Sequence, residues 1–355
     1  MPDEKIGRGP VSQPLRIVSM GGGTGLSALL HGLKKYAQSA PPEIDITAIV
    51  TVTDDGGSSG RLRRDFEVLP PGDIRNCMVA LSEDEALLSR LFQYRFQNGR
   101  GLKGHSFGNL FLTALTRITG DFHEAVKVSS EVLRIVGSIY PATAKNVVLE
   151  AVFENGRRVT GETRITKSRG RISKIRLRPG KCQPLPATLD AIARADLITF
   201  GPGSLYTSVI PNLLVEGIPD AVRNSPAVKA YFVNLMWQPC ETMGFNASDH
   251  VRAIYDHAGA GLLEYAVVNT GPVRPSLRKK YARQQVQPVE VDFEALEGMG
   301  LEVVAGNLLQ ESATVRHNPE AVATVALQLA REGRLRQLRS QLAAGNSMNL
   351  LWKRN

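Results

Sequence analysis

The stretch that decides the fold is LRIVSMGGGTGLSALLHGLKKYA, residues 15–37. Its apolar start, residues 15–20, predicts a buried strand that runs into a tight turn at Gly21-Gly22-Gly23. Beyond the turn, leucines at positions 26, 29, 30 and 33 have helical spacing. A second strand is expected at residues 44–53, IDITAIVTVT, which are rich in β-branched side chains. Strand, helix and strand in this order form a βαβ unit, which implies parallel strands and a right-handed crossover.

Strands and helices continue to alternate along the chain. Helical apolar spacing covers residues 74–91, 109–118 and 121–135, and Asp73 is placed to cap the first of these helices. After Pro184, strands are expected at residues 196–200, 230–235, 263–269 and 301–304, and helices at 187–195 and 248–258. Ser248 is the expected N-cap of the last helix. The predicted fold class is α/β, with a doubly wound, mainly parallel Rossmann-like sheet.

A small antiparallel β insertion is expected at residues 146–180. Residues 146–165 alternate around Asn155-Gly156, which is a strong hairpin signal, and a further strand is expected at 171–177. Ten Lys and Arg residues lie between Arg157 and Lys181, against one acid, Glu162. The predicted organisation is therefore an N-terminal tail at 1–14, a nucleotide-binding α/β domain at 15–145 and 181–330, the basic insertion at 146–180, and a basic C-terminal tail at 331–355.

Composition excludes several classes of protein. Of the 355 residues, 43% are hydrophobic and 22% are charged, which excludes a mostly disordered chain. No run of about 18 apolar residues occurs and the first sixteen residues have no apolar core, so neither a membrane span nor a secretory signal is expected. Three scattered cysteines, Cys77, Cys182 and Cys240, fit a reducing cytoplasm. The net charge of +9 suits an anionic ligand or partner, whereas basic runs without interleaved aromatic residues argue against nucleic acid.

Two glycine-rich turns follow predicted strands. Gly22, Gly23 and Gly25 belong to GGGTGLSA, which fits G-x-G-x-x-A after a strand and before a helix. Exposed backbone N–H groups and the helix dipole favour an anion there, typically phosphate. The second turn is GPGS, with Gly201, Gly203 and Ser204, and Thr207 follows it as a further hydroxyl donor. In a doubly wound sheet both turns lie at the same edge, where Asn234 ends another strand, and they could hold the two ends of one elongated nucleotide.

Asp54 and Asp55 end the second predicted strand, and three interpretations stay open for them. One of them could hold ribose hydroxyls, as the acid of a Rossmann fold does. One could bind Mg²⁺ near phosphates, or both could cap the following loop by accepting hydrogen bonds from its backbone N–H groups. Asn109, in GHSFGN, is a further ligand candidate because its amide both donates and accepts. No catalytic nucleophile–base pair is recognised.

An ordered set of motifs resembles the gluconeogenesis-factor family, which comprises bacterial proteins related in fold to 2-phospho-L-lactate transferases. The motifs are GGGTGLS, VTDDGGSSGRLR, PPGDIRNC, LKGHSFGNL, GPGSLYTSVIPNLLV and NLMWQP, and the resemblance covers residues 15–325. It implies a cytoplasmic regulatory protein that binds UDP-N-acetylglucosamine and tunes peptidoglycan precursor supply and cell shape during growth on gluconeogenic carbon. It implies no required cofactor and no firm reaction, and it leaves open a protein partner and a homo-oligomer.

The resemblance also assigns roles to individual residues. Thr24 and its neighbouring glycines would contact phosphate, and Asp54 would face the base or the ribose. Asn109 and the turn at 201–208 would line the same cleft. Two later positions match family residues near the nucleotide, Tyr281 and Arg316.

The chain departs from the family pattern after Asn234. The family reads N-x-M-T-Q-P-G-E-T-D, and here Trp237, Cys240 and Met243 replace its Thr, Gly and Asp. These changes could alter the sugar pocket, or Trp237 could simply pack over a neighbouring loop. The alternative function is a Mg²⁺-dependent transferase of phosphorus-containing groups that acts on a nucleotide-activated substrate, with Asp54 or Asp55 holding the metal. NADP is a further possible ligand of the same cleft.

Overall fold

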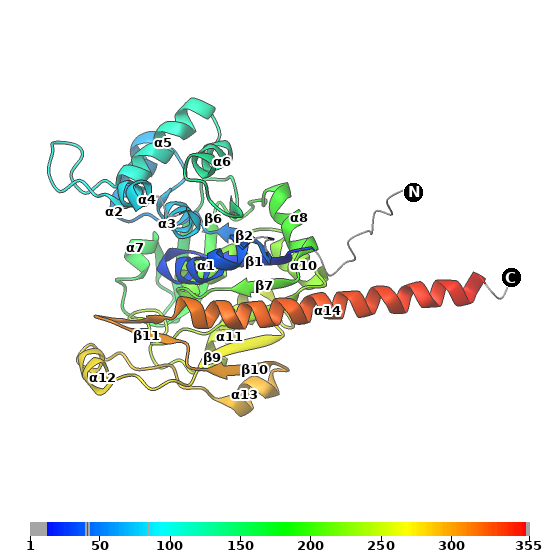
Figure 1. The fold of residues 1–355 in the computed structure, drawn as a ribbon. Coiled ribbons are helices and arrows are strands. Elements are labelled where there is room, and N and C mark those ends of the chain that lie inside the picture. The colour runs from blue at the N-terminus through cyan, green and yellow to red at the C-terminus, as the bar shows by residue number, and fades with distance from the viewer. Residues whose placement is uncertain (1–12, 40, 42, 84–85, 353–355) are drawn as a thin grey trace, which may run out of the picture.

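A computed structural model describes residues 13–39, 41, 43–83 and 86–352 of the chain. Most of the predicted N-terminal tail, residues 1–12, therefore lies outside the described residues. A single mainly parallel sheet forms the centre, helices cover both of its faces, and a long C-terminal helix runs past the body of the molecule (Figure 1). Within the described residues, no helix is both long enough and apolar enough to cross a bilayer.

The central sheet has seven strands in the order β10-β9-β8-β7-β1-β2-β3, and every neighbouring pair is parallel. The strands are β1 (Leu15–Gly21), β2 (Ile44–Val50), β3 (Ser138–Pro141), β7 (Leu197–Phe200), β8 (Val228–Phe232), β9 (Tyr265–Asn269) and β10 (Glu302–Gly306). From β1 the chain builds outward first through β2 and β3, and later on the other side through β7 to β10. The predicted doubly wound α/β class is confirmed, and its topological switch point lies between β1 and β7.

The first half of the sheet is covered by helices α1 (Gly23–Ala37), α2 (Gly57–Phe66), α3 (Gly72–Leu81), α4 (Ala86–Gln93), α5 (Phe107–Thr119) and α6 (Phe122–Val132). The prediction of one helix over residues 74–91 was wrong, because Ser82 is in extended conformation and ends α3. Strand β3 was missed. It has only four residues, SIYP, which are too few for a reliable strand signal, so its pairing with β2 is a tertiary effect.

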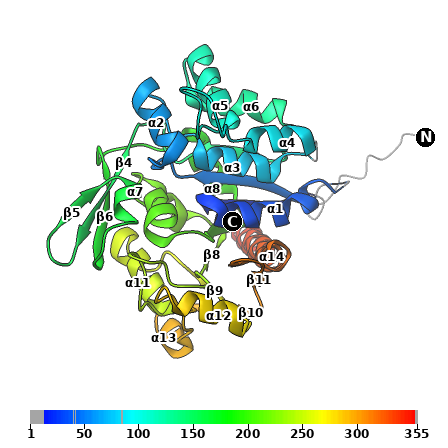
Figure 2. The same ribbon diagram turned by 90° about the vertical axis from the view of Figure 1, so that its left-hand side faces the viewer.

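The β insertion is a separate three-stranded antiparallel sheet, ordered β5-β4-β6. Its strands are β4 (Val148–Phe153), β5 (Arg158–Thr160) and β6 (Ile172–Arg178), which confirms the predicted hairpin (Figure 2). The predicted hairpin, residues 146–165, extended too far at its C-terminal end, because Glu162–Ile165 form a short helix, α7. Gly161, with a φ of 98°, turns the chain out of the strand just before α7.

The second half of the sheet is covered by α8 (Pro186–Arg194), the π-helical turn η2 (Leu205–Val209), α9 (Ile210–Leu213), α10 (Ile218–Asn224), α11 (Ala247–Ala258), α12 (Pro275–Ala282), α13 (Phe293–Gly298) and α14 (Pro319–Trp352). Strands β11 (Leu309–Glu311) and β12 (Val315–His317) form an antiparallel hairpin before α14.

The prediction that Ser248 is the N-cap of α11 was wrong. Asn246 caps α11 in a capping box with Asp249, while Ser248 bonds to Asp292.

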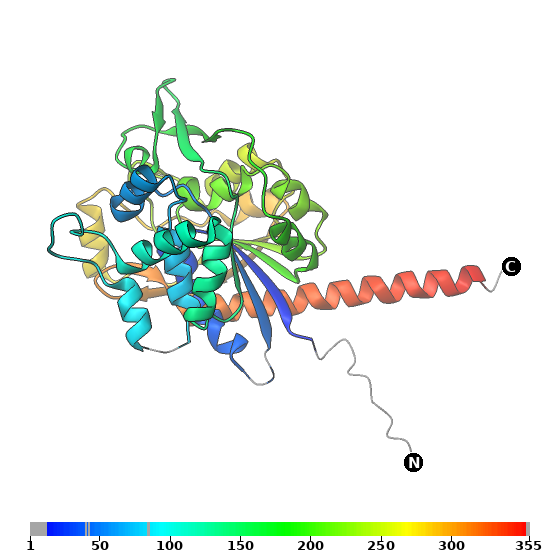
Figure 3. The same cartoon turned by 90° about the horizontal axis from the view of Figure 1, so that it is seen from above.

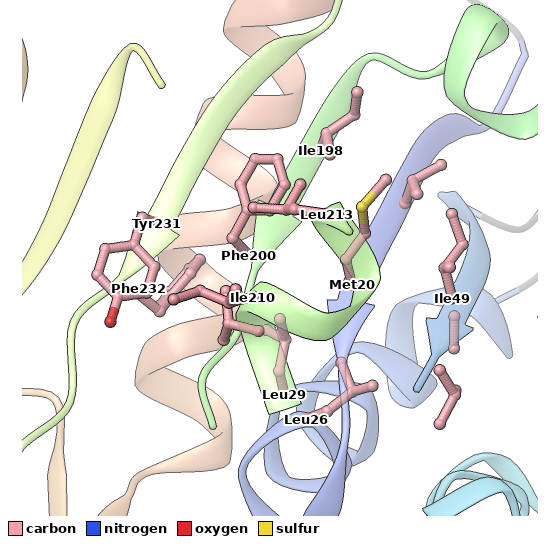
Figure 4. Close-up of a cluster of buried hydrophobic side chains, with 14 of the residues drawn as sticks. Met20, Leu26, Leu29, Ile49, Ile198, Phe200, Ile210, Leu213, Tyr231 and Phe232 are labelled. Carbon is pink, nitrogen blue, oxygen red and sulfur yellow. The ribbon is translucent and has the colours of Figure 1, made fainter. Parts of the chain in front are cut away.

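The core at the switch point fixes the start of the two helical segments that follow β1 and β7. Strand residues such as Met20, Ile198 and Phe200 pack against Leu26 and Leu29 of α1 and against residues of α9 (Figure 4). All are almost completely buried. Because these helices are held by their own apolar faces, the polar turns that precede them are held at the carboxyl edge of the sheet.

Helix α14 runs without a break across residue 330, where the basic tail was predicted to begin (Figure 3). Its first half packs against α1, and a Cβ atom on Gly32 of α1 would lie 1.9 Å from the carbonyl oxygen of Pro319. Arg334, beyond the predicted boundary, forms a bidentate ion pair with the buried Asp196 at the start of β7. The first residues of the predicted tail therefore belong to the folded body.

Candidate functional site

The two glycine-rich turns touch each other at the carboxyl ends of β1 and β7. A Cβ atom on Gly25 would lie 2.5 Å from the carbonyl oxygen of Pro202 and 2.9 Å from the Cα of Gly203, so the contact requires glycine at this position. Gly22 is the N-cap of α1 and has no side chain to accept a hydrogen bond from the first N–H groups of the helix. These donors and the positive end of the helix dipole are left for an anion.

A cavity of about 220 Å³ opens beside these turns. Eight predicted site residues line it, namely Gly22, Gly23, Thr24, Gly25, Gly203, Ser204, Asn234 and Arg316. Ser208, which belongs to the predicted turn at 201–208, lines it too. Sequence reasoning did not assign several others to the site, including Leu235, Met236, Gln238, Val315 and His317. The cavity is thus polar at the glycine turns and apolar along the loop after β8.

The remaining predicted residues lie outside the lining of this cavity. Gly201 has a φ of 76° and shapes the turn from β7, and Thr207 is buried within η2. Tyr281 lies behind the β11–β12 hairpin, where its hydroxyl accepts a hydrogen bond from the Val315 N–H at 3.0 Å. Asp54, Asp55 and Asn109 lie on the β2 side of the first turn.

A chain of hydrogen bonds orients Ser204 toward the cavity. The Tyr231 hydroxyl donates to Asn234 Oδ1 at 3.2 Å, and Asn234 Nδ2 donates to Gln238 Oε1 at 3.2 Å. Gln238 Nε2 then donates to Ser204 Oγ at 2.6 Å. Because Ser204 Oγ is already an acceptor here, its own proton is available to donate to a ligand in the cavity. Sequence reasoning did not select Gln238, because it lies in the loop after β8, where residue spacing does not predict which side chains meet.

The β11–β12 hairpin brings Arg316 to the N-terminus of α1. Arg316 Nη1 donates to Thr24 Oγ1 at 2.9 Å, although the two residues are 292 positions apart in the chain. Tyr281 and Lys280 of α12 hold the hairpin through its backbone, at the Val315 N–H and the Ala313 carbonyl. The site therefore combines backbone donors, hydroxyls and one guanidinium, which is the donor set that phosphate groups need.

Asp54 and Asp55 both accept hydrogen bonds from backbone N–H groups, but only Asp54 caps the loop that follows it, as the third interpretation expected for both. Asp54 Oδ1 accepts from the Gly56 N–H, and Asp55 Oδ1 accepts from the Thr163 N–H, each at 2.8 Å. A Cβ atom on Gly72 would lie 2.4 Å from Asp54 Oδ2 and 2.5 Å from Ser59 Oγ, so both side chains pack closely on the Gly72 backbone. Asp54 thus holds its own loop, Asp55 holds the first turn of α7, and neither carboxylate is among the residues that line the cavity.

Asn109 faces the same region from α5. Its Nδ2 donates to Ser59 Oγ at 3.2 Å, its backbone N–H donates to Ser106 Oγ, and its Oδ1 is buried with no partner among the described residues. Asn109 is therefore directed at the loop around Asp54.

Asp73 has a different role from the predicted one. The N-cap of α3 is Pro71, without a side-chain cap, and the Asp73 carboxylate instead accepts a hydrogen bond from the backbone N–H of Gly23. Desolvation and the neighbouring Asp54 charge raise the pKa of Asp73 to about 7. Burial likewise raises the pKa of Glu162 well above its usual range, and that of Glu241 to about 7. Of these buried carboxyl groups, Asp73 is the one that contacts the first glycine turn.

Asp73 is expected to make the stability of the protein depend on pH. Between about pH 4 and pH 7 the folded protein holds a proton on Asp73 that the unfolded chain has lost, so the free energy of unfolding falls as pH rises, by at most ~1.4 kcal/mol per pH unit. Asp73→Asn should flatten this slope in urea unfolding at pH 5, 6, 7 and 8. The control is Asp190→Asn at an exposed position. Equal slopes in wild type and Asp73→Asn would contradict the assignment.

The three departures from the family pattern have separate structural consequences. Trp237 lines the cavity and donates from Nε1 to the Phe245 carbonyl at 2.9 Å, so it packs over the neighbouring loop and also forms a wall of the site. Cys240 has a φ of 64°, a left-handed conformation that favours glycine and accounts for the glycine of the family pattern. Met243 is 42% exposed and lies outside the cavity lining.

Part of the basic charge of the insertion lies on one exposed face of its sheet. Arg158 of β5 and Lys174 of β6 flank Val152, and Arg176 lies opposite Glu150, which pairs with Arg178 at 2.9 Å. The opposite face carries the apolar side chains of the insertion and is buried. None of these basic residues is among the residues that line the cavity at the glycine turns.

Fold and site together define a Rossmann-like α/β protein with an anion-binding cradle at its switch point. A family model described as 2-phospho-L-lactate transferase CofD matches residues 17–309. The Bacillus subtilis protein named gluconeogenesis factor is 47% identical over 91% of this chain and 100% of its own length, and a putative gluconeogenesis factor from Nostoc sp. is 52% identical over 91% of this chain and 69% of its own. The chain belongs to the gluconeogenesis-factor family within this CofD family, which confirms the resemblance drawn from its motifs.

A crystal structure of a related protein supports the fold. This protein of Bacillus halodurans has a TM-score of 0.85 and 46% sequence identity to the chain, and the match covers 89% of this chain and 100% of the other.

Proposed function

We propose that this chain is a cytoplasmic regulatory protein that binds UDP-N-acetylglucosamine in the cavity between the two glycine turns. Support comes from the position of Arg316, whose guanidinium lies on Thr24 at the N-terminus of α1 and completes a cradle of donors for phosphate. The described lining residues include no Asp or Glu, so the cradle suits a diphosphate. Regulation of cell-wall precursor supply during gluconeogenic growth is the role we assign to this binding. The names of the relatives support the link to gluconeogenesis.

The shape of the cavity favours a nucleotide over a bare phosphate. Leu235, Met236 and Trp237 form an apolar wall next to the donors of the glycine turns. Nucleotide sites commonly combine such a wall for base or sugar with a few polar groups for phosphate. Trp237 occupies the position where the family has Thr, so we expect it to narrow the part of the site that receives the sugar.

A second candidate function is a transferase of phosphorus-containing groups, which the description of the family model favours. Asp54 and Asp73 lie beside the first glycine turn, and carboxylates are the ligands that Mg²⁺ prefers. Among the described residues no three acidic, His or Cys side chains form a metal site, so the protein would supply at most these two carboxylates. A Mg²⁺ ion held there would neutralise charge on the phosphates of a bound nucleotide.

Calorimetric titration with UDP-N-acetylglucosamine tests the proposal, with and without Mg²⁺ and with NADP as the comparison ligand. We expect saturable, metal-independent binding of the UDP-sugar and weaker binding of NADP. Binding that needs Mg²⁺, followed by consumption of the nucleotide, would favour the transferase. If the UDP-sugar does not bind under either condition, the proposed function is wrong.

A further inference from the structure

A second cavity, of about 240 Å³, lies at the carboxyl ends of β8 and β9. Val233 of its lining directly follows β8, and Val268 and Asn269 end β9. Asn234 and Leu235, which we call the shared segment, line both this cavity and the first cavity at the glycine turns. The two cavities therefore adjoin each other across the shared segment.

Both cavities are open to solvent, because exposed residues line each of them. Thr24 and Arg316 are exposed at the first cavity, and Thr270 and Arg278 are exposed at the second. Neighbouring parallel strands lie about 4.8 Å apart, so β9 lies roughly 10 Å beyond β7 along the carboxyl edge of the sheet. A ligand held by its phosphates at the glycine turns can thus extend over the shared segment into the second cavity.

The lining of the second cavity is mainly apolar, and its side chains include Val233, Leu235, Val268, Val273, Val289 and Val291. The Asn269 side chain is already occupied, because its Nδ2 donates to the Gly271 carbonyl and its Oδ1 accepts from the Leu308 N–H. A sugar carries hydroxyls on every side and would leave several of them unpaired in such a lining, which is costly. A nucleobase suits it better, because it has two apolar faces and a polar edge.

Arg278 supplies a donor for such an edge. It lies on α12, and its guanidinium forms no hydrogen bond or ion pair with the described residues. Its neighbours on the helix are used differently, since Arg274 pairs with Glu311 and Lys280 donates to the Ala313 carbonyl. A guanidinium can donate hydrogen bonds but cannot accept them, so Arg278 matches a carbonyl oxygen of a base.

We propose that the second cavity is the subsite for the nucleobase, with Arg278 donating to a carbonyl oxygen on the edge of the base. This inference rests on the proposed function. It places the base on the β8–β9 side of the phosphates and leaves the wall around Trp237 for the sugar. Asp54, which the resemblance placed at the base or the ribose, is not among the residues that line either cavity.

Calorimetric titration of Arg278→Gln with three probes tests the subsite. We expect UDP and UDP-N-acetylglucosamine each to bind about tenfold more weakly than to the wild type, because glutamine lacks the charge and the forked donors. Inorganic pyrophosphate reaches only the glycine turns, so its affinity should stay at the wild-type value. The wild type should also prefer UDP to ADP, because adenine has no carbonyl oxygen, and Arg278→Gln should lose most of that preference.

Lys279→Gln is the matched control. Lys279 is exposed, directly follows Arg278 on α12 and is not among the residues that line either cavity, so the variant removes the same charge from the same helix. We expect wild-type affinity for all three probes. A second variant, Thr270→Trp, adds bulk in the lining of the second cavity. It should weaken UDP and UDP-N-acetylglucosamine equally, and wild-type binding of pyrophosphate would show that its glycine turns are intact.

Four other results would overturn the inference. A loss confined to UDP-N-acetylglucosamine would place the sugar in the second cavity. Unchanged affinities for UDP and the UDP-sugar in both Arg278→Gln and Thr270→Trp would leave the second cavity without a role in binding. An equal loss for all three probes in Arg278→Gln would mean that Arg278 acts on the phosphates. If the wild type binds neither UDP nor UDP-N-acetylglucosamine, the proposed function itself is wrong, and the subsite with it.

Discussion

Replacing Arg334 by methionine is expected to lower the free energy of unfolding by about 3–5 kcal/mol. Arg334 Nε and Nη2 each donate to the Asp196 carboxylate at 2.7 Å, and the side chains are only 16% and 2% exposed. The same carboxylate accepts from the Arg16 N–H, and Arg334 Nη2 also donates to the Pro14 carbonyl. Without the guanidinium, a carboxylate remains buried at the start of β7 with its charge uncompensated.

Chemical denaturation of the wild-type and variant chains measures this effect. The control is Arg339→Met, an exposed arginine farther along the same helix, for which we expect a change within about 0.5 kcal/mol. The double variant Arg334→Met, Asp196→Asn removes the stranded charge and should be more stable than Arg334→Met alone. If Arg334→Met behaved like Arg339→Met, the first turns of the predicted basic tail would not belong to the folded body.

Replacing Arg316 by glutamine is expected to weaken UDP-N-acetylglucosamine binding by about ten- to a hundredfold. Hydrogen bonds to charged groups contribute about 1.5–3 kcal/mol each, and Arg316 is the charged side chain among the described residues that line the cavity. Glutamine keeps a donor but loses the charge and the forked geometry that match a phosphate. Calorimetric titration at fixed ionic strength measures the change.

The control for this substitution is Arg283→Gln, at an exposed position just after α12 and outside the cavity lining. It removes the same charge from the protein and should leave the affinity unchanged. Tyr281→Phe is a second comparison variant. It removes the hydroxyl that accepts a hydrogen bond from the Val315 N–H, and Tyr281 itself is not among the residues that line the cavity. We expect a smaller loss than for Arg316→Gln, and an equal or larger loss would place Tyr281 on the ligand itself.

Much of the fold could be predicted from local signals. These signals act over a few residues, and they are the leucines of α1, the glycines that precede it and the Asn155-Gly156 turn. The helix and the hairpin that they predict are confirmed. Errors arose where a neighbour distant in sequence decides the conformation. Ser82 interrupts a pattern that looks helical, and β3 exists because β2 offers it a partner. Asp73 looks like a helix cap but binds Gly23 of the first turn.

The sequence by itself determined that two glycine turns would lie at one edge of a parallel sheet, because the alternation of strands and helices allows few other topologies. It also determined which family the chain belongs to. Only the tertiary structure decided which side chains complete the cradle. Arg316 meets Thr24 across most of the chain, because a hairpin near the C-terminus folds back over α1. Such contacts depend on packing between distant segments, and residue spacing does not encode them.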